Sequence, residues 1–176
     1  MTDHREIPMP GGIPITRVEQ LEDFGRMIEK ILEGVPLSFD QVERVLDLAC
    51  GTGVMVAGAL DAFPNAQIDA IDYHADALSK IIRENPRVHF HKGYIIDQLS
   101  QPDFPKVEIV TLSFGSDSLG FTAGNIHLLA DHMTRYLITA GDNSYIQATP
   151  WFKKHFQWVK DDWHHNAQVW EKKTFS

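Results

Sequence analysis

Residues 45–72 constrain the fold more than any other stretch, because they combine a strand, a glycine turn, a helix and a second strand. The apolar run that opens the sequence VLDLACGTG is too short for a helix and is typical of a buried strand. Gly51 and Gly53 follow, and glycine permits both a tight turn and the close approach of a ligand to the backbone. An amphipathic helix over 54–63 and a strand over 66–72 complete a βαβ unit.

The second strand of this unit ends in a carboxylate, Asp72, 19 positions after Gly53. In nucleoside-binding βαβ units an acidic residue about 20 positions beyond the glycines meets a ribose hydroxyl. A nicotinamide dinucleotide is disfavoured, because branched Val56 occupies the crowded position of the third glycine. The chain also has no Gly-Lys-Ser/Thr loop for a triphosphate. The spacing therefore indicates a nucleoside ligand without a pyrophosphate.

Composition favours one globular domain and makes nucleic acid an unfavoured partner. The chain has 176 residues, 43% of them hydrophobic, and a net charge of −8, which gives no global attraction to phosphate backbones. The single cysteine, Cys50, excludes an intrachain disulfide. No signal peptide opens the chain, and no apolar run approaches the about 20 residues of a membrane span. We therefore expect a cytoplasmic protein without a membrane partner.

Helical and strand patterns alternate along the rest of the chain. After an irregular arm over 1–16, the spacing of apolar residues predicts further helices over 16–32, 75–84 and 123–137. Further strands are expected at 88–91, 107–114, 144–148, 156–159 and 167–173, with an irregular piece over 97–105. This order predicts an α/β fold, a Rossmann-like three-layer sandwich with helices on both faces. Its seven-stranded sheet is mostly parallel and ends in a C-terminal antiparallel hairpin.

Ligands of open parallel sheets bind beyond the carboxyl ends of the strands. Four candidate contacts fall at that edge, and each follows or ends a predicted strand. They are the Gly51–Gly53 turn, Asp72, the pair Gly93-Tyr94, and the pair Ser113-Phe114. Their agreement on one edge supports a single binding site there.

The sequence VLDLACGTG resembles the first motif of the class I S-adenosylmethionine-dependent methyltransferases, and Asp72 matches the acidic end of that family's second strand. The resemblance extends over about residues 40–175. It implies S-adenosylmethionine as the cofactor and methyl transfer as the activity. We accordingly divide the chain into an N-terminal arm and helix over 1–36 and a cofactor-binding methyltransferase domain over 37–176. The helix of the first part either packs against the sheet or forms a lid over the site with the arm.

The resemblance also implies roles for individual residues. The backbone from Ala49 through Cys50, Gly51 and Thr52 to Gly53 would line the methionine and ribose portions of the cofactor. Asp47 would lie near the amino group, Asp72 would accept hydrogen bonds from both ribose hydroxyls, and Tyr73 would border the adenine.

Two further pairs follow from the same resemblance. Many relatives carry Gly-Asp after the third strand, with the Asp at the adenine amine, whereas this chain has Gly93-Tyr94. Tyr94 would then stack on the adenine, and Asp97 is a weaker substitute for the missing carboxylate. Ser113 and Phe114 would lie between cofactor and substrate.

No catalytic residue is singled out by the sequence. Methyl transfer is an in-line displacement on an activated carbon, so the protein mainly aligns nucleophile and methyl group within about 3–3.5 Å. A base is needed only when the acceptor must lose a proton, and His127 and Asp117 are candidates for that role. We expect no metal site. Asp142-Asn143 would complete a magnesium site with Asp117, but it precedes the predicted fifth strand and so lies at the opposite sheet edge.

The leading hypothesis is an enzyme that methylates an oxygen or nitrogen atom of a small molecule. Methylation of a nucleobase or glutamine amino group is disfavoured, because no Asn-Pro-Pro-Tyr-like sequence follows the fourth strand. One alternative is a non-catalytic methyltransferase-like subunit, favoured by Tyr94 and by the little room for a helix after the predicted fifth strand. Another is a different reaction on the same fold. The sequence leaves open whether the chain forms a homo-oligomer.

Trp151-Phe152 is interpreted either as part of the core or as a wall of the substrate site. His89 and His91 are expected at the surface or in hydrogen bonds.

Overall fold

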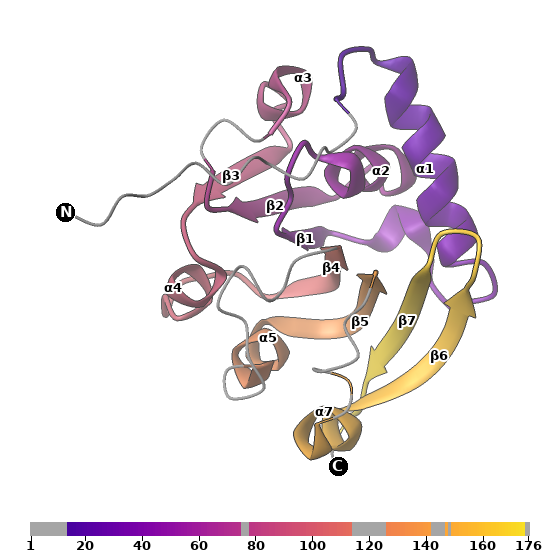
Figure 1. Ribbon diagram of the computed structural model, residues 1–176, viewed down its shortest axis with the longest axis vertical. Coiled ribbons are helices and arrows are strands. Elements are labelled where there is room, and N and C mark those ends of the chain that lie inside the picture. The colour runs from indigo at the N-terminus through magenta and orange to yellow at the C-terminus, as the bar shows by residue number, and fades with distance from the viewer. Residues whose placement is uncertain (1–13, 75–77, 114–125, 142–146, 148, 175–176) are drawn as a thin grey trace.

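The computed structural model describes residues 14–74, 78–113, 126–141, 147 and 149–174 (Figure 1). Seven strands form one sheet in the order β3-β2-β1-β4-β5-β7-β6. Their bounds are β1 (Arg44–Leu48), β2 (Gln67–Asp72), β3 (Val88–Lys92), β4 (Val107–Ser113), β5 (Met133–Ala140), β6 (Phe156–Asp162) and β7 (Ala167–Lys172). β1 to β5 are parallel, and β7 runs antiparallel to both β5 and β6. The predicted sheet, with its C-terminal hairpin, is confirmed.

Helices cover both faces of this sheet (Figure 1). They are α1 (Glu19–Ile31), the 3₁₀ turn η1 (Phe39–Gln41), α2 (Val54–Ala62), α3 (Lys80–Arg83), α4 (Ile95–Leu99), α5 (Ile126–His132) and α7 (Pro150–His155). Residues of α1, α2 and α3 share one apolar core with the sheet, and residues of α4, α5 and α7 share the other. Central β1 shows why, because Val45 belongs to the first core while Leu46 and Leu48 belong to the second. The predicted three-layer Rossmann-like sandwich is therefore confirmed.

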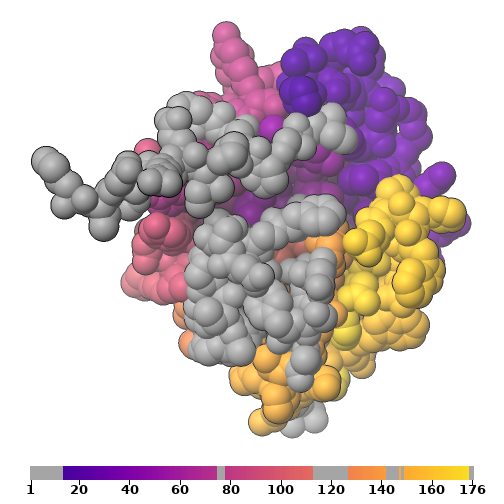
Figure 2. Space-filling model, in the orientation of Figure 1, coloured from indigo at the N-terminus to yellow at the C-terminus, as the bar shows by residue number. Residues whose placement is uncertain are grey.

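The N-terminal helix α1 packs closely on α2. Ile28 and Ile31 of α1 are buried, and a Cβ at Gly58 of α2 would lie 2.7 Å from the Phe24 carbonyl oxygen. At the surface, α1 is also a neighbour of the β6–β7 hairpin (Figure 2). There Lys160 Nζ donates to the carbonyl oxygen of Glu33 at 2.8 Å, just beyond the C-terminus of α1. One face of α1 is thus part of the protein core.

The sequence-based boundaries are wrong around the fifth strand. The helix predicted over 123–137 ends at His132, and β5 occupies Met133–Ala140 rather than 144–148, a stretch mostly outside the described residues. Met133 and Leu137 recur at a helical spacing, but residues 136–140 are a continuous buried run between β4 and β7. Such a run is the signature of a strand covered on both faces. Pairing with β4 and β7, together with burial of both faces, makes this segment a strand rather than a helix.

Other differences follow from this shift or are small. Residues 95–99, of which 97–99 were predicted to be irregular, form α4. Helix α3 is short, over Lys80–Arg83, with residues 75–77 outside the described part. Because β5 ends at Ala140, the chain has room for α7 before β6. The expected lack of a helix there is wrong. Phe152 of α7 is fully buried, which makes it a core residue.

The same shift removes the reason given for excluding a metal. Asp142 and Asn143 follow β5 in the chain rather than preceding the fifth strand, so the argument that they lie at the opposite sheet edge is wrong. Asp117, Asp142 and Asn143 all lie outside the described residues. Within the described ranges, no group of three or more His, Cys, Asp or Glu side chains is arranged to hold a metal ion. Among those residues, too, no helix has the length and apolar character of a membrane span.

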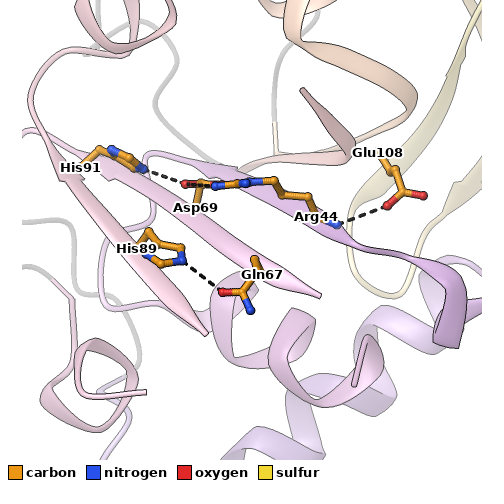
Figure 3. Close-up of polar contacts among 6 residues, drawn as sticks. All are labelled: Arg44, Gln67, Asp69, His89, His91 and Glu108. Carbon is orange, nitrogen blue, oxygen red and sulfur yellow. Dashed lines mark hydrogen bonds and ion pairs between the residues drawn. The ribbon is translucent and has the colours of Figure 1, made fainter. Parts of the chain in front are cut away.

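A polar network crosses the sheet face that α4 and α5 share, with side chains from β1, β2 and β3 (Figure 3). Buried Asp69 accepts from Arg44 Nε at 2.6 Å and bonds to His91 Nε2 at 2.8 Å. His89 Nε2 bonds to Gln67 Oε1 at 3.1 Å. Both histidines are therefore hydrogen-bonded, as expected. Burial alone would raise the pKa of Asp69, but the bonds from His91 and Arg44 lower it below its ordinary value.

We expect Asp69→Asn to destabilise the protein by about 1 kcal/mol at pH 7, because it removes charge-assisted hydrogen bonds from a buried acceptor. The lowered pKa means that the carboxylate stabilises the fold above its ordinary pKa and that this gain disappears as the pH falls below it. The difference between the two proteins should therefore vanish in acid. Urea unfolding at two pH values measures it, with exposed Asp40→Asn as the control. A difference that persists in acid would contradict the ion-pair interpretation.

Candidate functional site

The turn over Ala49–Gly53 joins β1 to α2 at the point where the strand order reverses between β1 and β4. Crevices at such a switch point are the usual ligand sites of open α/β sheets. Gly51 has φ 52° and Gly53 has φ 98°, a left-handed region that glycine adopts without a Cβ clash. A Cβ at Gly53 would also lie 2.6 Å from Leu78 Cδ1. Both glycines are therefore required by the shape of the turn.

Asp72, the last residue of β2, lies against this turn. Its Oδ2 accepts from the Gly51 N–H at 2.9 Å, and its Oδ1 accepts from the His74 N–H at 2.8 Å. Cys50 N–H donates to the Ile71 carbonyl oxygen at 3.1 Å, which fixes the turn to β2. The structure thus brings the predicted glycine turn and the predicted carboxylate into direct contact. Each carboxylate oxygen keeps a further lone pair for a ligand.

The end of β3 joins the same edge. Gly93 N–H donates to the Asp72 carbonyl oxygen at 2.9 Å. The Tyr73 and Tyr94 side chains are exposed, and their ring centroids are 4.8 Å apart. A hydrogen bond with Tyr73 raises the pKa of the Tyr94 hydroxyl. Two neighbouring aromatic rings therefore stand at the surface beside Asp72, where a planar ligand group can stack.

The remaining predicted residues divide into described and undescribed ones. Ser113 ends β4, one position beyond Leu112, which pairs with Leu48 at the end of β1. Its backbone therefore lies at the carboxyl edge, while Phe114 is outside the described residues. Exposed Asp97 lies in the first turn of α4, and exposed His127 lies on α5.

Asp47 is the least ordinary group of this site. It is buried, its Oδ1 accepts from Thr111 Oγ1 at 2.6 Å, and its Oδ2 has no hydrogen-bond partner in the described part of the chain. Desolvation raises the pKa of Asp47 to about 7, against the opposing bond from Thr111. A buried carboxyl oxygen without a hydrogen-bond partner lowers the stability of the fold, and residues that lower stability in this way are common at binding sites. Oδ2 thus keeps an unused acceptor position within the described part of the chain.

Two further features complete the electrostatics of the turn. No side chain caps the N-terminus of α2, so its first N–H groups carry the positive end of the helix dipole, which favours anions. Burial, together with Asp47 and Asp72, raises the pKa of the Cys50 thiol, so Cys50 is not a reactive thiolate. The turn contributes backbone groups rather than a nucleophile.

Sequence reasoning missed two residues that contact the site, Thr111 and Ser79, and the backbone conformation of a third, Ala49. Thr111 is a polar residue between the apolar Val110 and Leu112, which is the one signal that could have identified it. Ser79 binds the Thr52 carbonyl oxygen, and nothing in its sequence context shows this. Ala49 has φ 59°, a conformation that costs a residue with a Cβ about 1–2 kcal/mol.

We expect Ala49→Gly to stabilise the protein by about 0.5–1 kcal/mol, since relief of the left-handed strain exceeds the added entropy of the unfolded chain. Thermal or urea unfolding measures the change. The control is Ala59→Gly within α2, where φ is helical and the same substitution should destabilise by about 1 kcal/mol. Destabilisation of similar size by both variants would show that residue 49 is not strained.

Comparison with known proteins decides the family. A family model described as a methyltransferase domain matches residues 45–141, more than half of the chain. The chain belongs to this methyltransferase family. The matched span contains β1 from Val45 on, β2 to β5, the glycine turn and Asp72, and the resemblance inferred from the sequence is confirmed.

Two curated methyltransferases share parts of the sequence. A malonyl-[acyl-carrier protein] O-methyltransferase of Halalkalibacterium halodurans is 37% identical over 59 residues, covering 32% of this chain and 22% of that protein. A ribosomal protein uL3 glutamine methyltransferase of Burkholderia pseudomallei is 35% identical over 83 residues, covering 44% of this chain and 27% of that protein. This methyltransferase chain therefore aligns with only about a quarter of each relative's length.

The fold has close counterparts among solved structures. The MycE methyltransferase from the mycinamycin biosynthetic pathway, in complex with Mg and S-adenosylhomocysteine (SAH), superposes with a TM-score of 0.62 at 14% identity. The superposition covers 89% of this chain and 49% of MycE. At that identity the likeness establishes the methyltransferase fold and nothing finer.

Proposed function

We propose that this chain binds S-adenosylmethionine at the carboxyl edge of β1 and β2 and transfers its methyl group to an oxygen or nitrogen atom of a small molecule. The observation that carries the proposal is the 2.9 Å hydrogen bond from Gly51 N–H to Asp72, beside the unpartnered Oδ2 of Asp47. A backbone turn and two carboxylates at one switch point suit an adenosyl group that bears a cationic amino acid. Membership in the methyltransferase family supports the same activity.

The residues present fit this cofactor. Asp72 offers the free lone pairs of its carboxylate to the ribose hydroxyls, and the uncapped first turn of α2 favours the carboxylate of the methionine portion. Asp47 Oδ2, which has no partner among the described residues, would accept from the amino group. When bound, the cofactor supplies a methyl carbon activated by a sulfonium, so the chain needs to orient the acceptor and supply a base only for a protonated nucleophile.

We propose that the adenine contacts the aromatic rings of Tyr73 and Tyr94 rather than a carboxylate. Relatives with Gly-Asp after the third strand offer a carboxylate, whereas Tyr94 is exposed beside Tyr73 at 4.8 Å between ring centroids. Stacking on such rings recognises the planar base without a hydrogen bond to its amine. Cofactor analogues altered at the adenine amine should therefore bind nearly as well as the parent compound.

A small molecule is proposed as the acceptor because of the sequence that follows β4. One relative is named for methylation of an acyl-carrier-bound malonyl group and another for glutamine methylation of a ribosomal protein. In this chain β4 is followed by Phe114-Gly115-Ser116, which lacks the Asn-Pro-Pro-Tyr pattern associated with amide nitrogen. A small oxygen or nitrogen nucleophile therefore fits the sequence better than a glutamine side chain.

Turnover of labelled cofactor tests the activity. The protein is incubated with deuteromethyl-labelled S-adenosylmethionine and pools of small hydroxyl and amine compounds, and products are read by mass. Formation of SAH with a labelled product supports the proposal. If the cofactor binds but SAH forms no faster than with the Asp72→Ala variant, a non-catalytic role is favoured instead. Formation of a product without the label would indicate another reaction.

A further inference from the structure

Ser79 departs from the ordinary role of a serine that precedes a helix. It occupies the N-cap of α3 with φ −54° and ψ 139°, yet its side chain makes no capping hydrogen bond. A serine at this position normally accepts from an N–H of the first helical turn. Its hydroxyl is directed elsewhere.

The hydroxyl connects two segments that are distant in the sequence. Ser79 Oγ donates to the Thr52 carbonyl oxygen of the glycine turn at 2.8 Å and accepts from the Ile15 N–H at 3.2 Å. The Ser79 N–H donates to the same Thr52 carbonyl oxygen at 3.1 Å. The carbonyl is thus held twice by one residue, and that residue also binds the chain just before α1.

Burial strengthens this junction on both sides. Ile15 is 3% exposed and lies in the same apolar core as Leu78, the residue that fills the space beside Gly53. Next to it, residues 14–16 and α3 border a pocket of about 480 Å³. Residues 14–16, called the arm below, therefore meet α3 through a local contact that includes the hydrogen bond from Ile15 N–H to Ser79 Oγ.

We propose that Ser79 is a positioning residue that couples cofactor binding in the glycine turn to docking of the N-terminal arm at Ile15. This inference rests on the proposed function, because it assumes that the turn over 49–53 holds the cofactor. A ligand that fixes the turn fixes the Thr52 carbonyl oxygen, and through Ser79 it favours the docked arm. Coupling of two binding equilibria is reciprocal, so a docked arm must favour the ligand by the same factor.

Affinity for SAH in the full-length protein tests the coupling. Ser79→Ala should weaken SAH binding about tenfold, and Ser79→Thr, which keeps the hydroxyl, should restore it to within about threefold. Ser100→Ala is the matched control, because Ser100 is exposed and its hydroxyl makes no hydrogen bond among the described residues. Ile15→Ala should weaken binding as well, and the double variant should lose less than the product of the two single losses.

Proteolysis gives a second readout that a purely structural role would not move. Arg17 is exposed directly after the docked segment, so trypsin cleavage after it reports on the arm. Saturating SAH should slow that cleavage about threefold or more in the unaltered protein and in Ser79→Thr, but not in Ser79→Ala.

Several outcomes would overturn the inference. They are an unchanged SAH affinity in Ser79→Ala, a loss that Ser79→Thr does not restore, and equal protection of the Arg17 site in both variants. Failure of the proposed function is distinguishable, because the unaltered protein would then bind no SAH at all.

Discussion

Replacing Asp47 by Asn should stabilise the protein at alkaline pH by up to about 4 kcal/mol while weakening its affinity for SAH. Burial raises the pKa of Asp47 from 3.8 to about 7, so the folded state holds a proton that the unfolded state has already lost. Stability from this group is complete below 3.8 and is lost as the pH rises through 7. The magnitude is the free-energy equivalent of that pKa change, about 1.4 kcal/mol for each tenfold.

Urea unfolding of both proteins from pH 5 to pH 9 measures the effect. Only the difference between the two curves matters, because every other titrating group contributes equally to both. The difference should grow as the pH rises from 5 to about 7 and stay constant from there to pH 9, since the wild-type carboxyl then carries a buried charge that asparagine lacks. Parallel curves across this range would show that Asp47 is not a buried acid of raised pKa.

The ligand side of this prediction separates charge from shape. SAH carries an amino group, whereas 5′-methylthioadenosine carries no charged amino acid. Asp47→Asn should weaken SAH binding about tenfold or more, through loss of a charge-assisted contact, and leave methylthioadenosine within about twofold. For the same reason the wild-type protein should bind SAH more tightly at pH 8 than at pH 6. Equal losses for both ligands would place the amino group elsewhere.

Asp72→Ala should weaken SAH affinity by about 1.5–3 kcal/mol, the scale of hydrogen bonds to a charged acceptor. The substitution removes the proposed ribose acceptor together with the bonds from Gly51 N–H and His74 N–H. Calorimetric titration measures the loss, and unfolding experiments establish that the variant is folded. Asp72→Asn is the matched control, because it retains one acceptor oxygen and should lose less.

A cofactor analogue that lacks one ribose hydroxyl assigns the contact. In the wild-type protein the deoxy analogue should bind more weakly than SAH, and in Asp72→Ala the two should bind alike. The substitution in the protein and the missing hydroxyl in the ligand together form a double-mutant cycle, and its interaction energy measures the contact between them. Additive losses would mean that Asp72 only shapes the turn.

The βαβ unit at residues 44–72 was predictable because each of its signals is local. A short apolar run, two glycines at positive φ and a carboxylate at the end of the next strand fix the conformation with little help from the rest of the chain. The junction at Ala49 is the exception, because an alanine in a left-handed conformation carries no local signal. Its strain is visible only in the folded turn.

The errors arise where tertiary packing decides. Met133 and Leu137 fit a helix, but the segment pairs with β4 and β7 along its two edges and packs into an apolar core on each face, which makes it β5. The bond from Thr111 to Asp47 depends on β4 lying beside β1, an order that the sequence does not state. The contacts of Ser79 depend on three segments meeting. Because β5 ends at Ala140, helix α7 precedes the β6–β7 hairpin. One argument for a non-catalytic subunit is thereby removed.

Calorimetric titration of the unaltered protein with SAH and with S-adenosylmethionine tests the cofactor assignment most directly. We expect saturable binding of both, one ligand for each chain, with SAH affinity lowered in Asp72→Ala. Absence of binding to either ligand at high micromolar concentration, with the protein shown to be folded, would contradict a cofactor site at the edge formed by the glycine turn and Asp72.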